Sequence, residues 1–135
     1  SFGLTPEQFR DWVAPYDIQV LAAASSLVRI AHLHGEDANP ELIADYPVEV
    51  LSWSDKASAP TIPEATSRYG WVPMVGIDEL TSLYWTPSEA VAHVIQARRA
   101  AGDRLIVAPN CTLHSDINPL TLVGLRRGVD VALTY

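Results

Sequence analysis

The sequence predicts an α/β protein built on a parallel sheet. Four short apolar runs alternate with segments that carry helix-start signals, and the runs are continuous rather than alternating. Continuous apolar runs are typical of strands buried on both faces, as in a parallel sheet covered by helices. We therefore expect strands over residues 27–33, 48–53, 72–77 and 105–108.

Helix starts are marked by a capping residue followed by proline. The segments 5–8 and 86–89 each place Thr at the N-cap, Pro at the first helical position and Gln or Glu at the third, which is a capping box. Asn-Pro at 39–40 and 118–119 gives the same signal without the box. The pattern predicts helices over residues 6–24, 40–45, 63–69, 87–101 and 119–127.

A leading helix followed by four βα units makes about half of a (β/α)8 barrel, and an open four-stranded sheet is the alternative shape. The length of 135 residues fits one domain. In either shape the outer strands, residues 27–33 and 105–108, have unpaired edges. We expect these edges to cause self-association, or to be covered by terminal segments or by a missing N-terminal half.

Composition restricts the class of partner. The net charge is −7 and 48% of the residues are hydrophobic, so we expect a globular protein that binds neither nucleic acid nor an anionic membrane. No apolar stretch is long enough to span a bilayer, and no signal peptide is evident. A single cysteine excludes an internal disulfide and fits a cytoplasmic protein.

Three residues at predicted strand ends form a candidate metal site. His32 and His34 end the first apolar run, where their i, i+2 spacing places both side chains on one face of a strand. Cys111 follows the last run. Because parallel strands end at the same edge, two imidazoles and a thiolate there could hold zinc and leave a fourth position open, as in catalytic zinc sites.

These residues also carry a family resemblance. The chain resembles the C-terminal part of the uroporphyrinogen decarboxylase superfamily, which includes zinc-dependent, cobalamin-dependent methyltransferases. The resemblance rests on the order and spacing of blocks at residues 15–16, 32–35, 48–53, 75–78, 86–89 and 106–111. It implies the second half of a (β/α)8 barrel, with a small-molecule thiol as substrate and methyl-cobalamin on a partner protein as methyl donor.

Two branches of this superfamily compete, and a third hypothesis is a non-catalytic half-barrel fragment. The methyltransferase branch binds zinc through a His-x-Cys pair and a distant Cys; His32 and Cys111 match, whereas His34 stands where cysteine is usual. Imidazole is also a good zinc ligand. Uroporphyrinogen decarboxylase, which acts on porphyrinogens in heme biosynthesis, needs no cofactor and usually lacks these ligands, so their presence favours the zinc branch.

Other polar residues near strand ends are weaker candidates. Asp55 and Asp78 lie where barrel enzymes place acid–base or substrate-orienting groups, although either could instead cap a helix. Glu36 could supply a fourth ligand, and His114 could replace His34 as a ligand. A solvated loop is the alternative for Glu36, and a position in a surface loop is the favoured interpretation for His114.

Overall fold

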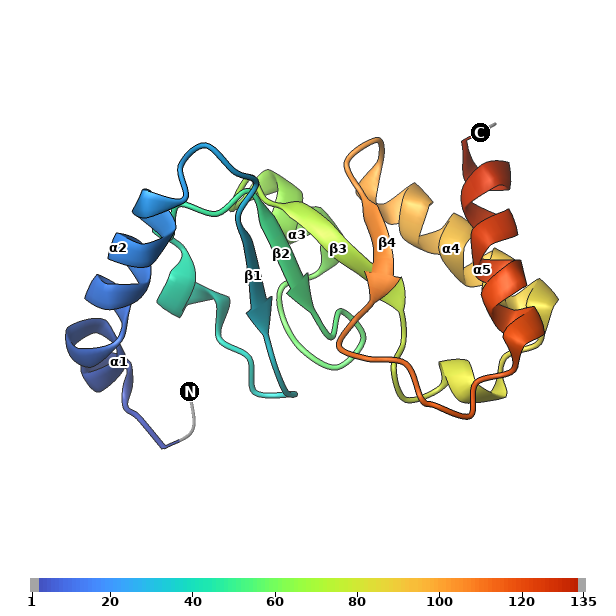
Figure 1. The fold of residues 1–135 in the computed structure, drawn as a ribbon, viewed down its shortest axis with the longest axis horizontal. Coiled ribbons are helices and arrows are strands. Elements are labelled where there is room, and N and C mark those ends of the chain that lie inside the picture. The colour runs from blue at the N-terminus through green and yellow to red at the C-terminus, as the bar shows by residue number, and fades with distance from the viewer. Residues whose placement is uncertain (1–2, 134–135) are drawn as a thin grey trace.

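The computed structural model describes residues 3–133, and these form one four-stranded sheet in the order β1-β2-β3-β4 with every pair parallel (Figure 1). The predicted α/β fold class is confirmed, and the arrangement is consistent with a partial parallel barrel. The elements are α1 (Pro6–Trp12), α2 (Ala14–Ala23), β1 (Ile30–Leu33), η1 (Pro40–Ile43), β2 (Val50–Trp53), α3 (Ile62–Ser67), β3 (Val72–Ile77), η2 (Ser82–Tyr84), α4 (Pro87–Ala101), β4 (Ile106–Pro109) and α5 (Pro119–Ala132).

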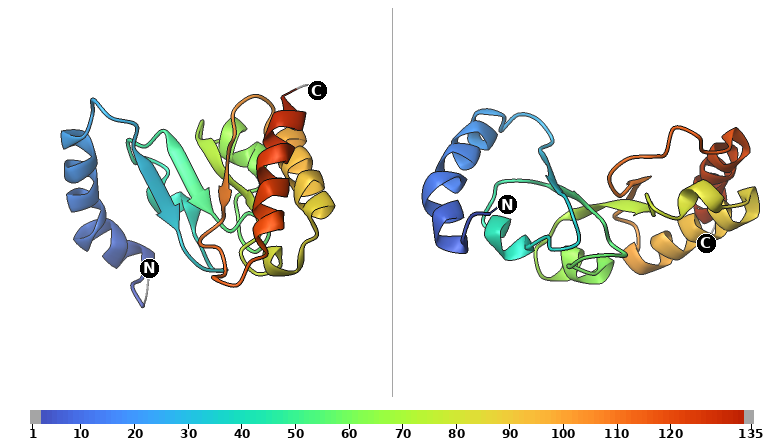
Figure 2. Two further views of the ribbon diagram at one scale, coloured as in Figure 1. Left: turned by 45° about the vertical axis from the view of Figure 1, so that its right-hand side comes forward. Right: turned by 90° about the horizontal axis from the view of Figure 1, so that it is seen from below.

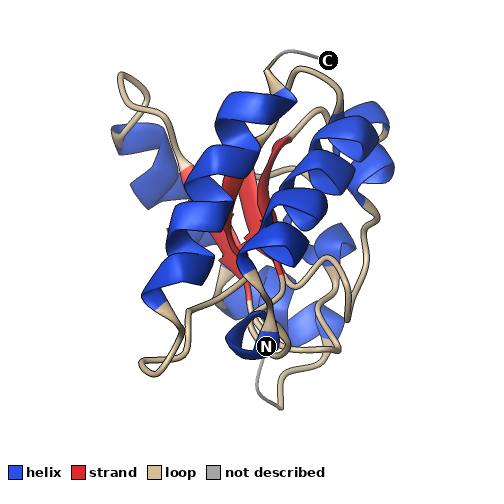
Figure 3. Cartoon of the chain, turned by 90° about the vertical axis from the view of Figure 1, so that its right-hand side faces the viewer, coloured by secondary structure: helices blue, strands red, loops and turns tan. Residues whose placement is uncertain are grey.

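The helix pairs α1–α2 and α4–α5 flank opposite ends of the sheet, beyond β1 and β4 respectively (Figure 1). Seen from below, α3 and α4 lie on the same side of the strands (Figure 2). Figure 3 shows α5 beside α4. None of the helices in residues 3–133 is long and apolar enough to cross a membrane.

All four predicted N-caps are confirmed by the structure. Thr5 and Thr86 both form complete capping boxes, and Asn39 and Asn118 accept a backbone N–H through their side chains. A third capping box at Thr61 begins α3. Each such cap satisfies amide groups that the first helical turn leaves without partners.

Four predicted helices have other bounds in the structure, and the smallest difference is at α3, which runs over Ile62–Ser67 rather than 63–69. The expected helix 6–24 divides at Val13, because Pro15 has no amide to donate and its ring obstructs the preceding turn. Residues 40–45 form only a short 3₁₀ helix over Pro40–Ile43. The last helix continues to Ala132, because Gly128 does not end it. Gly128 instead lets α5 pack closely on α4, since a Cβ there would lie 2.8 Å from the Cβ of Val94.

Three strands begin later than predicted, because pairing decides where the ladder starts. The register pairs Ile30 with Val50 and Met74 with Ile106, so residues 27–29, 48–49 and 105 lie outside the ladders. The unpaired edges are confirmed within the described chain: β1 pairs only with β2, and β4 only with β3. Self-association through these edges stays a prediction.

The core has two parts. Leu51 and Trp53 of β2 and Val75 of β3 are fully buried in the first, which lies between the sheet and α3. Val94 of α4 and Leu125 of α5 are buried in the second. These clusters bury the inner strands β2 and β3, whereas the outer strand β1 is half-buried or exposed along its length.

An ion pair joins the amino ends of β1 and β2. The Arg29 guanidinium contacts both carboxylate oxygens of Glu49, and the Arg29 amide N–H also donates to Glu49 Oε2 at 2.8 Å. These hydrogen bonds lower the pKa of Glu49 from its usual 4.5 to about 2. The hydrogen bond from the Arg29 side chain has the largest effect, and that from the Arg29 amide comes second. Both residues lie at the opposite end of their strands from the carboxyl edge of the sheet.

The Glu49 pKa predicts an acid-sensitive contribution to stability. Since the folded pKa is the lower one, the stabilisation is fully present above about pH 4.5 and is lost as the pH falls through 2. The difference in unfolding midpoint between the wild-type protein and Glu49→Gln should therefore shrink steadily from pH 5 to pH 2. Glu36→Gln, in an exposed loop, is the control; a difference independent of pH would contradict the assignment.

Candidate metal centre

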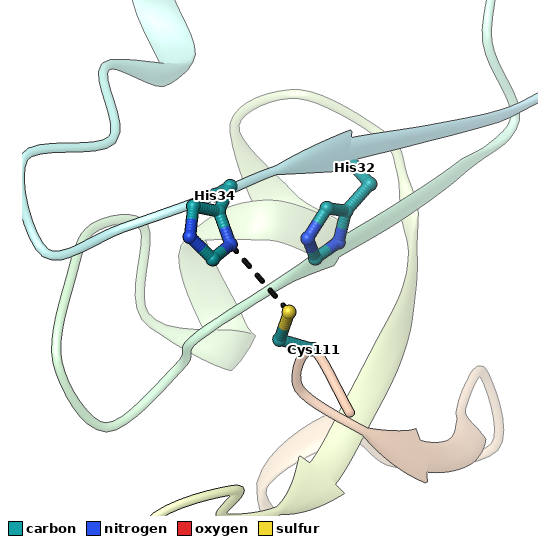
Figure 4. A group of neighbouring side chains, drawn as sticks. All are labelled: His32, His34 and Cys111. Carbon is teal, nitrogen blue, oxygen red and sulfur yellow. Dashed lines mark hydrogen bonds between the residues drawn. The ribbon is translucent and has the colours of Figure 1, made fainter. Parts of the chain in front are cut away.

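His32, His34 and Cys111 come together at the carboxyl edge of the sheet (Figure 4). Their ligand atoms all lie within 4.8 Å of one another, and the three residues are exposed. They form the only group of three or more His, Cys, Asp or Glu side chains with metal-binding spacing in residues 3–133. The convergence that the strand pattern predicted is therefore present.

Curvature of the sheet makes this meeting possible. His34 follows β1 and Cys111 follows β4, which are the two outermost strands. Strands in a flat sheet are about 4.8 Å apart, so β1 and β4 would be separated by roughly 14 Å. The observed distance from His34 Nδ1 to Cys111 Sγ is 3.5 Å. Such an approach requires a sheet that curls toward a barrel, with both histidines and the cysteine on its concave side.

The donor set fits a zinc ion. Tetrahedral zinc with ordinary Zn–N and Zn–S bonds places a nitrogen and a sulfur ligand about 3.6 Å apart. The His34 Nδ1 to Cys111 Sγ distance of 3.5 Å agrees with that value. The ring centroids of His32 and His34 are 6.0 Å apart and the rings are tilted by 45°, so neither ring blocks the other. Two imidazoles and one thiolate would leave the fourth position open, as in catalytic sites.

Asn110 fixes the position of Cys111. This residue is only 1% exposed. Its backbone N–H donates to Ile77 O at 2.9 Å, and its side-chain Oδ1 accepts the Gly76 N–H at 3.2 Å. Gly76 has a φ of +109°, and a Cβ there would lie 2.9 Å from the Cβ of Ala97. Only glycine fits this position, which holds β3 against α4 and presents its amide to Asn110.

Ser52 links the two ligand-bearing strands and was not singled out from the sequence. Its register partner in β1 is His32. The Ser52 hydroxyl donates to the Asn110 carbonyl at 3.3 Å and lies 3.1 Å from His32 Nδ1. The available signal was a single hydroxyl within the otherwise apolar residues 50–53, although recognising its role requires the register.

Neither predicted acid–base residue is hydrogen-bonded to the three-residue cluster in the described structure. Asp78 caps its own turn, accepting from the Leu80 and Thr81 amides and from the Thr81 hydroxyl. The Asp55 side chain is 2% exposed and lies 3.0 Å from Lys56 Nζ, while its Oδ1 has no partner within residues 3–133. A catalytic role for either carboxylate stays a prediction.

The alternative ligands lie outside the cluster. His114 Nδ1 accepts the Asp116 N–H at 3.2 Å, and this pair belongs to the exposed loop between β4 and α5. Glu36 is exposed in the loop that follows His34. Both placements agree with the simpler interpretation of a solvated loop.

A cavity of about 520 Å³ adjoins the two histidines. Besides His32 and His34, it is lined by apolar side chains that include Val20 of α2, Leu33 of β1 and Leu42 of η1. The cavity gives a small molecule room to approach the imidazoles from the β1 edge of the sheet.

Comparison with known proteins finds similarity to solved structures. No family model and no curated protein matches the chain. A solved structure, a methyltransferase from Methanosarcina mazei, is similar with a TM-score of 0.72 and 23% sequence identity, covering 95% of this chain and 38% of that one. The likeness shows the fold. It supports a methyltransferase-like fold without identifying the uroporphyrinogen decarboxylase superfamily, and the chain spans well under half of that methyltransferase's length.

Proposed function

We propose that this chain is part of a methyltransferase-like enzyme and that His32, His34 and Cys111 hold its zinc ion. The observation that carries the proposal is the convergence of two imidazoles and one thiol at the carboxyl edge of a parallel sheet. Barrel enzymes place their chemistry at this edge. The likeness in fold to a methyltransferase supports the same reading.

A zinc ion at such a site supplies Lewis acidity that lowers the pKa of a bound thiol and yields a nucleophilic thiolate. The protein's part is to hold the ligands. With neutral imidazoles at His32 and His34 and a thiolate at Cys111, the site keeps one net positive charge. A second cysteine in place of His34 would cancel that charge, so this donor set favours ionisation of the substrate thiol more strongly.

The substrate in this proposal is a small thiol, and the methyl donor is methyl-cobalamin carried by a partner protein, as the family resemblance implies. The cavity beside the two histidines gives the thiol a route to the site. Because the chain corresponds to 38% of the methyltransferase it resembles, we propose that methyl transfer needs further chain or a second copy.

Decarboxylation of a porphyrinogen is less favoured, since it needs cationic groups to hold the substrate's carboxylates. Arg29 pairs with Glu49, and Arg104 donates to the Gly70 carbonyl at 2.8 Å. Both residues precede strands and so lie at the opposite end of the sheet from the cluster.

The proposal is tested by zinc analysis of tag-free protein. The wild-type chain should bind about one equivalent, and His34→Ala and Cys111→Ala should each weaken binding more than about 100-fold, beyond the 10–100-fold typical of residues that only orient ligands. In Co²⁺-loaded protein, the sulfur-to-cobalt charge-transfer band should vanish with Cys111→Ala and persist with His34→Ala at saturating cobalt.

His114→Ala is the matched control, since it removes a nearby exposed histidine that contacts Asp116 rather than the cluster. It should bind zinc as the wild-type chain does. Absence of zinc binding by the wild-type chain, or equal binding by all the variants, would refute the three-ligand site.

A further inference from the structure

We propose that Ser52 positions His32 for metal binding by fixing its imidazole in the Nδ1–H tautomer. The inference rests on the proposed zinc site and assigns Ser52 a role at that site. Ser52 is 7% exposed, so its hydroxyl must find its hydrogen-bond partners within the protein. The structure gives it two, His32 Nδ1 at 3.1 Å and the Asn110 carbonyl at 3.3 Å.

The two hydrogen bonds together determine the tautomer. A carbonyl oxygen only accepts, so the single hydroxyl proton of Ser52 goes to Asn110. The Ser52 oxygen can then take part in the second hydrogen bond only as an acceptor. His32 Nδ1 must therefore carry the proton, and the lone pair of the neutral ring lies on Nε2.

This proton arrangement suits metal binding. A ligating histidine commonly donates its other ring N–H to an oxygen, which fixes both the tautomer and the orientation of the ring. His34 presents Nδ1 toward Cys111 at 3.5 Å. The two histidines thus offer different ring nitrogens, Nε2 from His32 and Nδ1 from His34. The hydroxyl of Ser52 hydrogen-bonds the ring of its register partner His32, whereas the next hydroxyl along the chain, that of Ser54, hydrogen-bonds Glu79.

The same hydroxyl connects both halves of the site. Asn110 immediately precedes Cys111, and its backbone and side chain are already held by Ile77 and Gly76. The hydrogen bond from Ser52 to Asn110 therefore ties the His32 ring to the segment that carries the thiol. Loss of the hydroxyl would release the His32 ring and one of the contacts that holds the strand ends together.

The tautomer can be measured without metal. Two-bond ¹H–¹⁵N correlation spectra of metal-free protein at about pH 8, where an ordinary imidazole is neutral, should show His32 as the Nδ1–H tautomer. Ser52→Ala should shift His32 toward the Nε2–H tautomer that solvated histidines prefer, leave the tautomer of His34 unchanged, and raise the zinc Kd by about 10–100-fold.

Two further variants separate positioning from general packing. Ser52→Thr keeps the hydroxyl and should restore both the tautomer and the zinc Kd. Ser54→Ala removes another buried hydroxyl, which hydrogen-bonds Glu79 and not the cluster, and should change neither.

The outcomes distinguish this inference from the proposed function. An unchanged His32 tautomer in Ser52→Ala, or a shifted tautomer with an unchanged zinc Kd, overturns the role of Ser52 while the zinc site stands. Failure of the wild-type chain to bind zinc overturns the proposed function, and with it the metal-positioning role. In that case the tautomer shift alone would still report the Ser52–His32 hydrogen bond.

Discussion

Replacement of Trp53 by alanine should destabilise the protein by roughly 3–5 kcal/mol, the usual range for truncating a large buried aromatic side chain. Trp53 is fully buried at the carboxyl end of the inner strand β2, and its indole N–H donates to the Pro60 carbonyl at 2.8 Å. The substitution leaves both a cavity and a buried carbonyl without its donor. Domains of ordinary stability have about 5–15 kcal/mol in total, so the loss is a substantial fraction of the folding free energy.

Chemical denaturation measures this loss, with Trp12→Ala as the matched control. Trp12 is 60% exposed, and its removal should change stability by no more than about 0.5 kcal/mol. Trp53→Phe retains most of the ring and should lose about 1–2 kcal/mol, which keeps the test informative if the alanine variant does not fold. Similar losses for Trp12→Ala and Trp53→Ala would contradict the placement of the core.

The second large effect is expected at the contact between α4 and α5. A Cβ added at Gly124 of α5 would lie 2.5 Å from the Pro87 carbonyl oxygen and 2.9 Å from the Pro87 Cα. Backbone atoms cannot move aside as a flexible side chain can, so Gly124→Ala should separate the two helices and cost about 1–3 kcal/mol.

The sign of this effect makes the test specific. In an unpacked helix interior, replacing glycine by alanine stabilises by roughly 0.5–1 kcal/mol. Val123→Ala, on the neighbouring exposed position of α5, should change stability only slightly. Thermal or denaturant unfolding measures the stability of both variants. A Gly124→Ala protein more stable than the wild type would show that α4 and α5 do not approach so closely.

The parts of the fold that depend on local chemistry could be predicted from the sequence. The caps at Thr5, Thr86 and Asn118 are formed by residues within three positions of each other, so their spacing carries the whole signal. The bounds of α4 were predicted without error for the same reason. Pro15 was equally visible, but its effect depends on whether tertiary contacts tolerate a bend.

The candidate site likewise has features that could be predicted from the sequence and features that could not. Strand direction predicts that His32, His34 and Cys111 share one edge of the sheet, but their close approach also requires the curvature that brings β1 toward β4. The hydrogen bonds of Ser52 and Asn110 depend on register and curvature, which no local pattern encodes. Asp55 and Asp78 were singled out from their positions at strand ends. Such a position does not determine the direction of the side chain, and neither carboxylate is hydrogen-bonded to the cluster.

The place of β1 at the outside of the sheet has a consequence for how zinc affinity is interpreted. A strand that paired with β1 in the parallel sense would end next to His34, on the side of the cluster away from Cys111. A side chain just beyond that strand could add a ligand to the proposed zinc site. If that site binds zinc, a longer protein that added such a ligand would bind it more tightly than this chain does. Affinity measured on this chain would then be a lower limit for the longer protein.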